Sequence, residues 1–600
     1  MRKNKEKKLS YWPLGLVFAA PITYSTKLLE MDNLQKLFFF IAAGFAVLYF
    51  VKKSDKPTVV NLDKKLLLLI LVFPVTFLTS VLNGSSEMLL LQITSLLPQI
   101  TLILFTIIIL TKLGEETFFK ISSFAIVIVS TMFSFIGLLQ VMSIEIIPLP
   151  QILLPGSTIG QRGFAAEYLV AAIPFFMISA KYIKIDYRAL LFFAAIINIA
   201  FLYFTRSRSA FLISLALLLA VIIFYFFKKD KSEKVKSLIP IIGVFVIGFA
   251  ISLIPPIKGE RSDFGENISS VVNTDNKSNS LRLEFWNASV QMIESNPWIG
   301  IGLNKWSGFY PKYFGDDFTD GQIHFVYAIH AHNDFLELFA ENGILSLIVY
   351  LSILLMILYN LFKKIKLSEN YFYVFLSAFS LIAMSFISFP MHKFSSYFFL
   401  SVSAGAALLT NQDKTTSIGF QSIRIRFVFI SLFIVGIITS YIRLTSELSY
   451  IKAIEYRNGG DYKNMLVNLE EINLMLFPLE PTKQPVEYHL ATANYRQRNF
   501  KKALQHSLNS EELAPFNPMV LHITAGIYQS SREYGKAIVY YENMRKYFPN
   551  YIDPQVNLLI IYADQKDFEK AKYLYNELIE KSPENKRLLE IKSKYPHLFS

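Results

Sequence analysis

The segment "HAHNDFLELFAENG" (330–343) places polar side chains directly before a long apolar run. His332 precedes the first turn of the helix that this run predicts, and a neutral imidazole can accept a proton near neutral pH. Asn333 or Asp334 can cap that helix, with Glu337 three residues after Asp334 as in a capping box. The N–H groups of a first turn attract an anion. The pattern indicates a general base beside an anion site. The alternative, which the segment alone favours, is that His332 is only a helix-capping or interfacial residue.

A metal site is a second interpretation of the same segment. His330 and His332 form a His-x-His pair of the kind that binds metals in some hydrolases. No further ligand follows at a suitable spacing, and nearby arginines would repel a divalent cation. We therefore predict neither a metal nor a cofactor. The chain has no cysteine, which excludes disulfides, thiolate zinc ligands and thiol nucleophiles.

Four arginines stand in segments that we expect on the same side of the membrane as His332. Arg206 and Arg208 share the short turn "FTRSRSAF", Arg162 lies in "GSTIGQRGFAAEYL", and Arg282 lies in a long loop. Cations at these places oppose the usual orientation signal. Guanidinium groups match phosphate oxygens in bidentate geometry. We predict that they bind a diphosphate; the alternative is that they contact lipid headgroups or carboxylates.

Apolar segments dominate the chain of 600 residues, which is 53% hydrophobic with a mean hydropathy of +0.39. A helix needs about 20 residues to cross a bilayer. We predict an all-α, polytopic transmembrane helical bundle of about 12–13 spans. The candidate spans are roughly 12–29, 34–51, 66–83, 89–111, 120–141, 164–181, 189–205, 209–227, 238–254, 343–362, 371–390, 394–410 and 427–444.

Basic clusters such as "VKKSDK" and "KKDKSEKVK" occupy alternate connections between these segments. Because cytoplasmic loops are typically basic, we place the N-terminus in the cytoplasm. An odd number of spans then puts the C-terminal region outside. Membrane orientation accounts for the net charge of +13, and we predict no nucleic-acid partner. The first apolar stretch lacks a cleavage site and is expected to remain as a helix.

The composition becomes polar and helical after residue 446, with a period of 34 residues. Phe500, Tyr534 and Phe568 recur at this spacing, and alanines and prolines follow it as well. The period resembles the tetratricopeptide repeat, which predicts an α-solenoid that can bind a protein partner. The predicted domains are a membrane domain, 1–446, with core motifs at 156–362 and a large external loop at 255–342, and an external repeat domain, 447–600.

One segment, "AHNDFLELFAENGILSLIVYL", resembles the hallmark of the O-antigen ligase and O-antigen polymerase superfamily, a His-Asn pair followed by Glu-x-Gly before a membrane helix. Three upstream segments resemble further motifs of that family in the same order: "GQRGFAAEYLVAAIPF" (160–175), "TRSRSAFL" (205–212) and "LRLEFWNASVQMIESNPWIGIGLNKW" (281–306). Ala166 and Glu167 stand where the family usually has an asparagine.

The resemblance implies a metal-independent glycosyltransferase of the bacterial cytoplasmic membrane. Such an enzyme moves a glycan from a polyprenyl diphosphate carrier to a hydroxyl of a lipid or protein acceptor at the outer membrane face. The roles carried over are catalytic for His332, diphosphate-binding for Arg206, Arg208, Arg282 and Arg162, and supporting for Asn333, His330 and Glu337.

Two other functions compete with a ligase. A polymerase of the same superfamily would extend the glycan itself, and the motifs scarcely separate the two. The external repeats favour a ligase because they can recruit an acceptor. A transporter of lipid-linked sugar is disfavoured, since no span carries a central run of ionisable residues.

Overall fold

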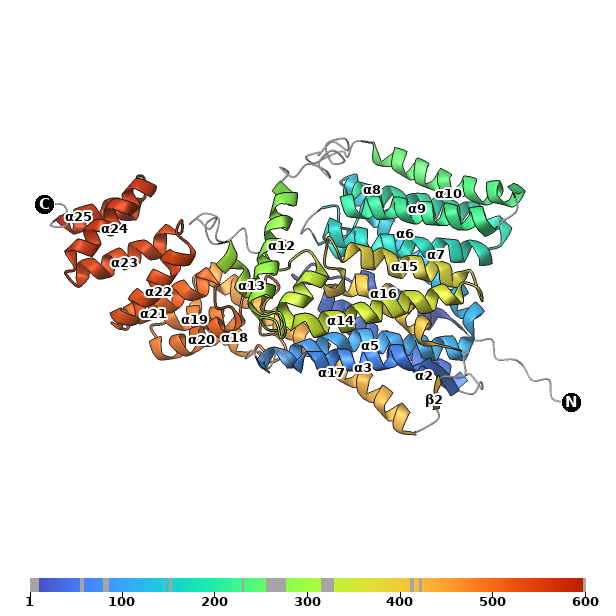
Figure 1. Cartoon of the computed structure of the whole chain (residues 1–600), viewed down its shortest axis with the longest axis horizontal. Coiled ribbons are helices and arrows are strands. Elements are labelled where there is room, and N and C mark those ends of the chain that lie inside the picture. Colours follow the sequence, from blue (N-terminus) through green and yellow to red (C-terminus); the bar gives the residue numbers. More distant parts are fainter. Residues whose placement is uncertain are drawn as a thin grey trace.

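The structure is a computed structural model, and it is almost entirely helical. It describes residues 10–53, 59–78, 82, 86–144, 146–150, 154–228, 231–254, 277–314, 328–410, 415–419 and 423–596. A bundle of long helices forms one part of the molecule, and a string of short helix pairs extends from it to the C-terminus (Figure 1). This arrangement confirms the predicted all-α class, a polytopic membrane bundle followed by a helical solenoid.

Eight helices among the described residues are long and apolar enough to cross a membrane. They belong to α2 (Asp32–Lys53), α5 (Ser86–Leu113), α6 (Glu115–Val141), α7 (Arg162–Tyr182), α8 (Arg188–Phe204), α9 (Arg208–Lys228), α14 (Asp334–Lys364) and α17 (Ile423–Asn458).

Four shorter apolar helices match four further predicted spans. They lie in α1 (Trp12–Ala19), α10 (Lys231–Ser252), α15 (Asn370–Met384) and α16 (Phe394–Leu408). The span predicted at 66–83 corresponds to α3 (Lys64–Thr76), whose 13 residues are fewer than a straight crossing needs. Residues 79–81 and 83–85 lie outside the described part of the chain.

The centre of the bundle is α16, in which every residue from Phe394 to Leu408 is buried. Gly405 lies so close to α5 that an added Cβ would be 2.6 Å from the Cβ of Thr106. Small residues let membrane helices approach in this way, where apolar packing against lipid provides no net driving force. The tight packing fixes α16 within the bundle, and the start of this helix adjoins the candidate site.

A small antiparallel sheet was not expected from the sequence. It pairs β1 (Val59–Asp63) with β2 (Thr415–Gly419), so that Val59 lies opposite Gly419. Both strands fall in connections that we predict to be cytoplasmic. Short strands of this length leave little signal in a sequence, because their pairing partner is far away along the chain.

The last membrane helix, α17, continues past residue 446 without a break. On it, the carboxylate of Glu447 accepts hydrogen bonds from the backbone N–H groups of Leu29 and Glu30, at 2.9 and 2.8 Å, and from Asn33 Nδ2 at 3.1 Å. The boundary predicted at 446–447 thus falls within one helix that is tied to the N-terminal part of the bundle, and the domain division stays a prediction.

The repeat region forms a succession of helix pairs that follows the predicted period. Helices α20, α22 and α24 begin at Phe500, Tyr534 and Phe568, and Ala503, Ala537 and Ala571 are each 0% exposed. These alanines allow the paired helices to approach closely, as the repeat pattern predicts. The helices are α18 (Tyr462–Glu470), α19 (Val486–Arg496), α20 (Phe500–Leu513), α21 (Pro518–Ser530), α22 (Tyr534–Tyr547), α23 (Ile552–Asp564), α24 (Phe568–Lys581) and α25 (Lys586–Lys594).

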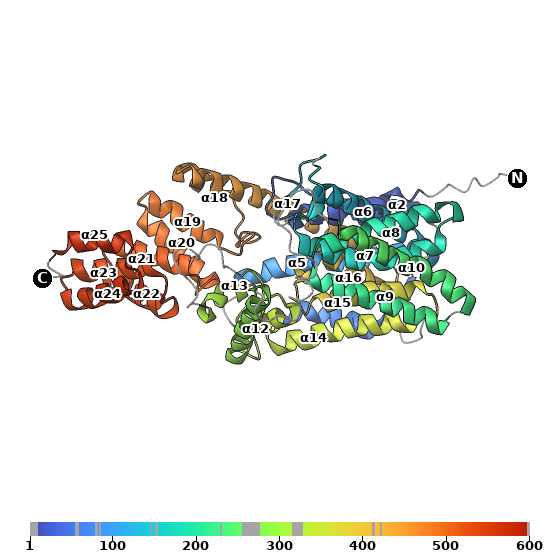
Figure 2. The same ribbon diagram turned by 90° about the horizontal axis from the view of Figure 1, so that it is seen from above.

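Three short elements of the long loop lie between the bundle and the solenoid (Figure 2). They are α12 (Lys277–Ser295), α13 (Trp306–Phe309) and the 3-10 turn η4 (Tyr310–Tyr313). Gly308 contacts the solenoid so closely that a Cβ would lie 2.7 Å from the Cα of Ala514, and its carbonyl accepts from the N–H of Phe516 at 3.2 Å. The solenoid is therefore held against the loop that carries the family-like motifs.

Candidate active site

The N-terminus of α14 is capped by Asn333. Its Oδ1 accepts from the N–H groups of Phe335 and Leu336, at 3.0 and 3.1 Å. Glu337 does not complete the expected capping box, because Asn333 rather than Asp334 is the cap. Its Oε2 instead reaches six residues back along the chain and accepts from the N–H of Ala331 at 2.7 Å. The motif thus folds the His-x-His segment over the first turn of the helix.

Glu337 also gathers two histidines. His330 Nδ1 lies 2.8 Å from Glu337 Oε1, and His392 Nε2 lies 3.4 Å from the same oxygen. The ring of Phe389 stacks on His330 with a centroid separation of 4.4 Å. Burial lowers the pKa of both imidazoles, and the charges of Lys483 and Lys393 lower them further. Both rings are therefore neutral near pH 7 and serve as hydrogen-bonding groups.

His332 also contacts Phe389, with its ring nearly perpendicular to that of Phe389. Its backbone adopts a left-handed conformation with φ 53°, and its ring packs between Phe285 and Phe389, at centroid distances of 5.9 and 5.0 Å. Nδ1 is buried and makes no hydrogen bond within the described part of the chain. Burial lowers the pKa of His332 to about 4, the charge of Arg282 adds to this, and Glu337 opposes it. An unprotonated imidazole with an open nitrogen suits a general base.

Three of the four predicted arginines lie together with His332. Arg162 begins α7 and Arg208 begins α9, and the charges of the two interact. Burial and the charge of Arg208 lower the pKa of Arg282, which in turn acts on His332. Like charges brought together in this way favour an anion between them. The helix starts supply N–H groups for the same purpose.

Arg206 has a different environment from the other three. Its backbone is left-handed, with φ 54°, and its Nη2 donates to the carbonyl oxygen of Ser252 at 3.1 Å. Its guanidinium also lies 5.9 Å from the ring centroid of Phe204. These contacts connect the turn between α8 and α9 to the end of α10. Arg206 therefore holds the turn that presents Arg208, and its predicted contact with diphosphate stays a prediction.

The sequence interpretation missed a carboxylate that organises the neighbouring elements. Glu167, 1% exposed on α7, accepts from Ser388 Oγ at 2.5 Å and from Ser396 Oγ at 2.9 Å. It thereby ties the helix that begins at Arg162 to the segment before α16. The available signal was that Glu167 stands where the family usually has an asparagine. An acidic residue buried in a helix requires hydrogen-bonding partners, and this requirement pointed to neighbouring polar side chains.

The glycines of the two remaining motifs interlock. Helix α14 breaks at Gly343, where φ is 76° and ψ 178°. The segment "NPWIGIG" fills the break: Ile301 N donates to Ala340 O at 2.8 Å, Gly302 N to Glu341 O at 3.0 Å, and Ile344 N to Pro297 O at 3.0 Å. The Glu341 side chain accepts from the N–H of Trp306 at 3.0 Å. This clasp fixes α12 and α13 on the first turns of α14.

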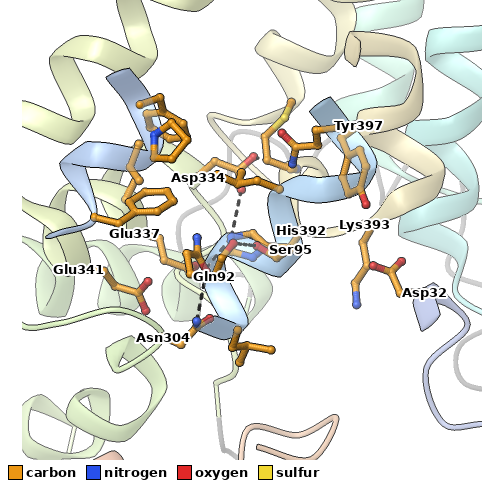
Figure 3. A pocket seen from close by; sticks show the side chains of 18 of the residues that line it. Asp32, Gln92, Ser95, Asn304, Asp334, Glu337, Glu341, His392, Lys393 and Tyr397 are labelled. Atoms are coloured by element: carbon orange, nitrogen blue, oxygen red, sulfur yellow. Dashed lines mark hydrogen bonds and ion pairs between the residues drawn. The ribbon is translucent and has the colours of Figure 1, made fainter. Parts of the chain in front are cut away.

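A cavity of about 250 Å³ opens on the far side of this cluster. Its walls include His330, Asp334, Glu337 and His392, but neither His332 nor any of the four arginines. Figure 3 shows Gln92, Asn304 and Glu341 on one wall and Lys393, Tyr397 and Asp32 on another. The site therefore has two sides, an arginine side with His332 and a cavity side with His330, Glu337 and His392.

The arrangement also bears on the metal interpretation. His330, Glu337 and His392 have ligand atoms within 4.8 Å of one another. The structure thus brings a further histidine and a carboxylate to His330, which the sequence interpretation had not foreseen, but it does not include His332 in this group. Glu337 already bonds to His330 and to the backbone, and the charges of Lys393 and Lys483 act on the same histidines. These cations oppose a divalent metal, and the expectation of no metal stays a prediction.

Together, the fold and the site define a polytopic helical membrane protein whose long loop and helix starts gather arginines around a histidine. The family model described as O-Antigen ligase matches residues 191–351. The matched segment is therefore similar to that family, as the resemblance of the motifs predicted. It contains Arg206, Arg208, Arg282, His330, His332 and Glu337, whereas Arg162 and His392 lie outside it.

Other comparisons add little to this result. No curated protein matches the chain. Among solved structures, one match is "Crystal structure of APC/C hetero-tetramer Cut9-Hcn1", at 10% sequence identity over 94% of this chain and 90% of that chain. Its TM-score is 0.23, which is too low to indicate a shared fold.

Proposed function

We propose that the protein is an O-antigen ligase-like transferase. It moves a glycan from a polyprenyl diphosphate carrier to a hydroxyl of a lipid or protein acceptor at the outer face of the bacterial cytoplasmic membrane, without metal or cofactor. The observation that supports the proposal is that α12, which carries Arg282, contacts His332 through the stacked ring of Phe285 at a centroid distance of 5.9 Å, while the charge of Arg282 interacts with Arg208 and His332. Arg282 thus belongs to the proposed anion site and also lies near the proposed base.

The transfer step follows from this placement. The acceptor hydroxyl gives its proton to the neutral imidazole of His332 while its oxygen bonds to the anomeric carbon of the donor sugar. The bond from that carbon to the diphosphate oxygen breaks, and its electron pair leaves with the diphosphate. The arginines stabilise the charge that grows on this leaving group, which is where positioned cations accelerate a reaction most. The membrane confines donor and site to one interface, which raises their effective concentration.

A polymerase is the second candidate, because the same chemistry serves it when the acceptor is another carrier-linked glycan. The contact of Gly308 with Ala514 favours the ligase, since it holds the solenoid beside the motif-bearing loop. A domain at that place can present an acceptor. A transporter would use neither a base nor a leaving-group site, so nothing in the arginine side favours it.

A transfer assay with the full chain in lipid nanodiscs tests the proposal. Lipid-linked glycan is supplied as donor, with candidate acceptors added one at a time, and product is measured per minute. His332→Ala should lose transfer about 10²–10⁴-fold, the usual contribution of a general base. The control is His506→Ala, which changes a histidine in the solenoid that pairs with Glu487.

The outcomes separate the candidate functions. One added glycan per acceptor supports a ligase, and products of increasing length on the carrier itself support a polymerase. Transfer by His332→Ala at the parent rate would remove His332 from the catalytic step. Movement of donor across the bilayer without any transfer would replace the proposal with a transporter.

A further inference from the structure

We propose that the cavity between the bundle and the solenoid is a binding site for a sugar head group carried on a lipid, and that the solenoid forms one of its walls. The site would hold the acceptor, so this inference rests on the proposed function. It adds a place and a chemistry for the acceptor and assigns residues of the repeat region to the site.

The polar wall of the cavity is rich in groups that bind hydroxyls. Gln92, Ser95, Gln99 and Asn304 line it, and Asn304 Nδ2 donates to Gln92 Oε1 at 3.2 Å. Amide and hydroxyl side chains both donate and accept, as a sugar hydroxyl does. Carboxylates and lysines line the same cavity together, so the site does not select a simple anion or a simple cation. A neutral, polyhydroxylated group satisfies this mixture.

Buried polar atoms without a partner point into the same space. Asp334 Oδ1 and the hydroxyls of Tyr350 and Tyr397 make no hydrogen bond within the described residues, and all three side chains line the cavity. Asp334 is 4% exposed and Tyr397 3%; the nearest ion-pair contact of Asp334 Oδ1 is His392 Nε2 at 3.6 Å. Buried polar groups are nearly always hydrogen-bonded, and the hydroxyls of a bound sugar would supply the missing partners.

The cavity becomes apolar towards the interior of the bundle. On α5 its lining runs from Gln92 to Ile103, about 16 Å along the helix axis at 1.5 Å per residue. Its deeper walls are formed by Phe73, Ile353, Ile357, Leu400 and Ala404. A free sugar would leave this surface uncovered, whereas an apolar chain attached to the sugar would cover it. This gradient favours a glycolipid over a soluble saccharide or a protein.

The solenoid contributes the segment from Leu476 to Lys483. Lys483 has a left-handed backbone, with φ 69°, and its N–H donates to Glu480 O at 2.8 Å. Its ammonium faces carboxylates of the bundle, because the charges of Glu30, Glu341 and Glu337 act on it.

The turn that carries Lys483 is braced by the next residue, Gln484. Gln484 N donates to Glu480 Oε1 at 3.0 Å, and Asn517 Nδ2 donates to Gln484 Oε1 at 2.7 Å. The repeat region is thus rigidly joined to the cavity wall rather than flexibly tethered near it. A change in the first repeat should therefore alter which head group fits.

The cavity and the arginine side meet at one place. His330 and Glu337 close the end of the cavity, while His332, two residues from His330, faces Arg282. The sugar head group would bind on the cavity side of His330 and the diphosphate among the arginines, and the acceptor hydroxyl must extend past His330 to reach His332, which does not line the cavity. Two substrates can then bind together without sharing a pocket.

Photo-crosslinking tests the assignment. The probe is decyl maltoside with a diazirine on its sugar, applied to the full chain in nanodiscs, and labelled peptides are identified by mass spectrometry. We expect adducts in 92–99, 394–404 and 476–483, with competition by unmodified decyl maltoside but not by decylphosphocholine. Equal competition by both amphiphiles, or adducts confined to lipid-facing residues, would overturn the sugar site.

Variants sharpen the same experiment. Gln92→Leu and Asn304→Leu should each weaken labelling about fivefold, the effect of one lost hydrogen bond, and Lys483→Gln should weaken it as well. Gln497→Leu, a change at an amide of the solenoid that bonds to Tyr462 O, is the matched control and should label normally. Labelling that is unchanged in all three cavity variants would overturn the proposal.

The two proposals can fail separately. His332→Ala should reduce transfer about 10²–10⁴-fold and still be labelled as the parent is, because His332 does not line the cavity. Cavity labelling in a protein without transfer activity would support the sugar site and contradict the proposed ligase activity. Transfer to a glycolipid by a protein that is not labelled in the cavity would remove the sugar site alone, and saturable labelling by an acceptor peptide instead of the glycoside would identify a protein acceptor.

Discussion

The variant Gly343→Ala tests whether the break in α14 holds the site together. The backbone at Gly343, with φ 76° and ψ 178°, lies in a region that essentially only glycine adopts. A Cβ there would lie 2.1 Å from the carbonyl oxygen of Trp298. The backbones at Gly343 and Trp298 cannot both keep their positions after this substitution, so the hydrogen bonds between "NPWIGIG" and α14 must break or shift.

The size of the effect follows from the contacts. An unfavourable backbone conformation costs about 1–3 kcal/mol, and each of the three hydrogen bonds across the break contributes about 0.5–1.5 kcal/mol. Loss of all of them destabilises the clasp by about 2.5–7.5 kcal/mol. Since about 1.4 kcal/mol corresponds to tenfold, the clasp should open about 60-fold more often, or more.

Hydrogen exchange of the protein in nanodiscs measures this opening. The amides of Ile301, Gly302 and Ile344 donate across the break, and their exchange should accelerate by at least that factor in Gly343→Ala. Two control variants separate the effect of the backbone conformation from the effect of the added side chain. Gly460 has φ 76° with open space around it and Gly535 has open space without a positive φ, so alanine at either position should leave these three amides unchanged.

The result that refutes the reasoning is equally specific. Exchange at the three amides of Gly343→Ala that equals the exchange of Gly535→Ala would mean that the clasp tolerates a side chain. Faster exchange together with parent-like transfer would mean that the clasp does not position the candidate site.

Four further predictions concern the site and the orientation. Burial lowers the pKa of His332 to about 4, and the charge of Arg282 adds to this; Arg282→Gln should raise that pKa in part, so the acidic limb of the pH–rate profile, where the base becomes protonated, should move to higher pH, and an unmoved limb would separate the two residues. Arg162→Ala, Arg208→Ala and Arg282→Ala should each reduce transfer with normal membrane insertion, and lysine should rescue only in part because it lacks the planar fork; full activity in all three would place the diphosphate elsewhere. EDTA should change neither the parent nor any variant, and activity lost with EDTA and restored by a divalent metal would return the cluster of His330, Glu337 and His392 to a metal role. Reporter fusions after residues 54, 232 and 366 should read cytoplasmic and those after 87, 270 and 460 external; a cytoplasmic result at 460 would remove the solenoid from the acceptor side.

The membrane helices were largely predictable because their signal is local. A run of apolar residues long enough to cross a bilayer must form a helix, since lipid offers no partner for its backbone groups. The repeats were predictable for a related reason, as Ala503 and its counterparts recur with the period of the unit that they pack. In contrast, β1 and β2 are separated by more than 350 residues, and no local sequence pattern predicts that they pair.

The site was predictable only in part. Local patterns singled out His332, Asn333 and the arginines, and Asn333 does cap α14. The sequence interpretation treated Arg206 and Arg208 as one pair, but a turn directs Arg206 to Ser252 and Arg208 towards Arg162 and Arg282. Side chains two residues apart in a turn can point in different directions. The spacing of residues along the chain does not reveal those directions.

The sequence by itself determined the helical class, the period of the repeats and the residue types that could handle a diphosphate and a proton, because each of these depends on neighbours along the chain. Only the tertiary structure decided that Glu337 joins His330 to His392, that Gly343 accepts the "NPWIGIG" segment, and that Lys483 of the solenoid reaches a cavity of the bundle. Some of these residues, such as Lys483 and Gln92 in the walls of one cavity, are almost 400 positions apart. Packing of whole helices brings them together, and no short stretch of sequence contains that information.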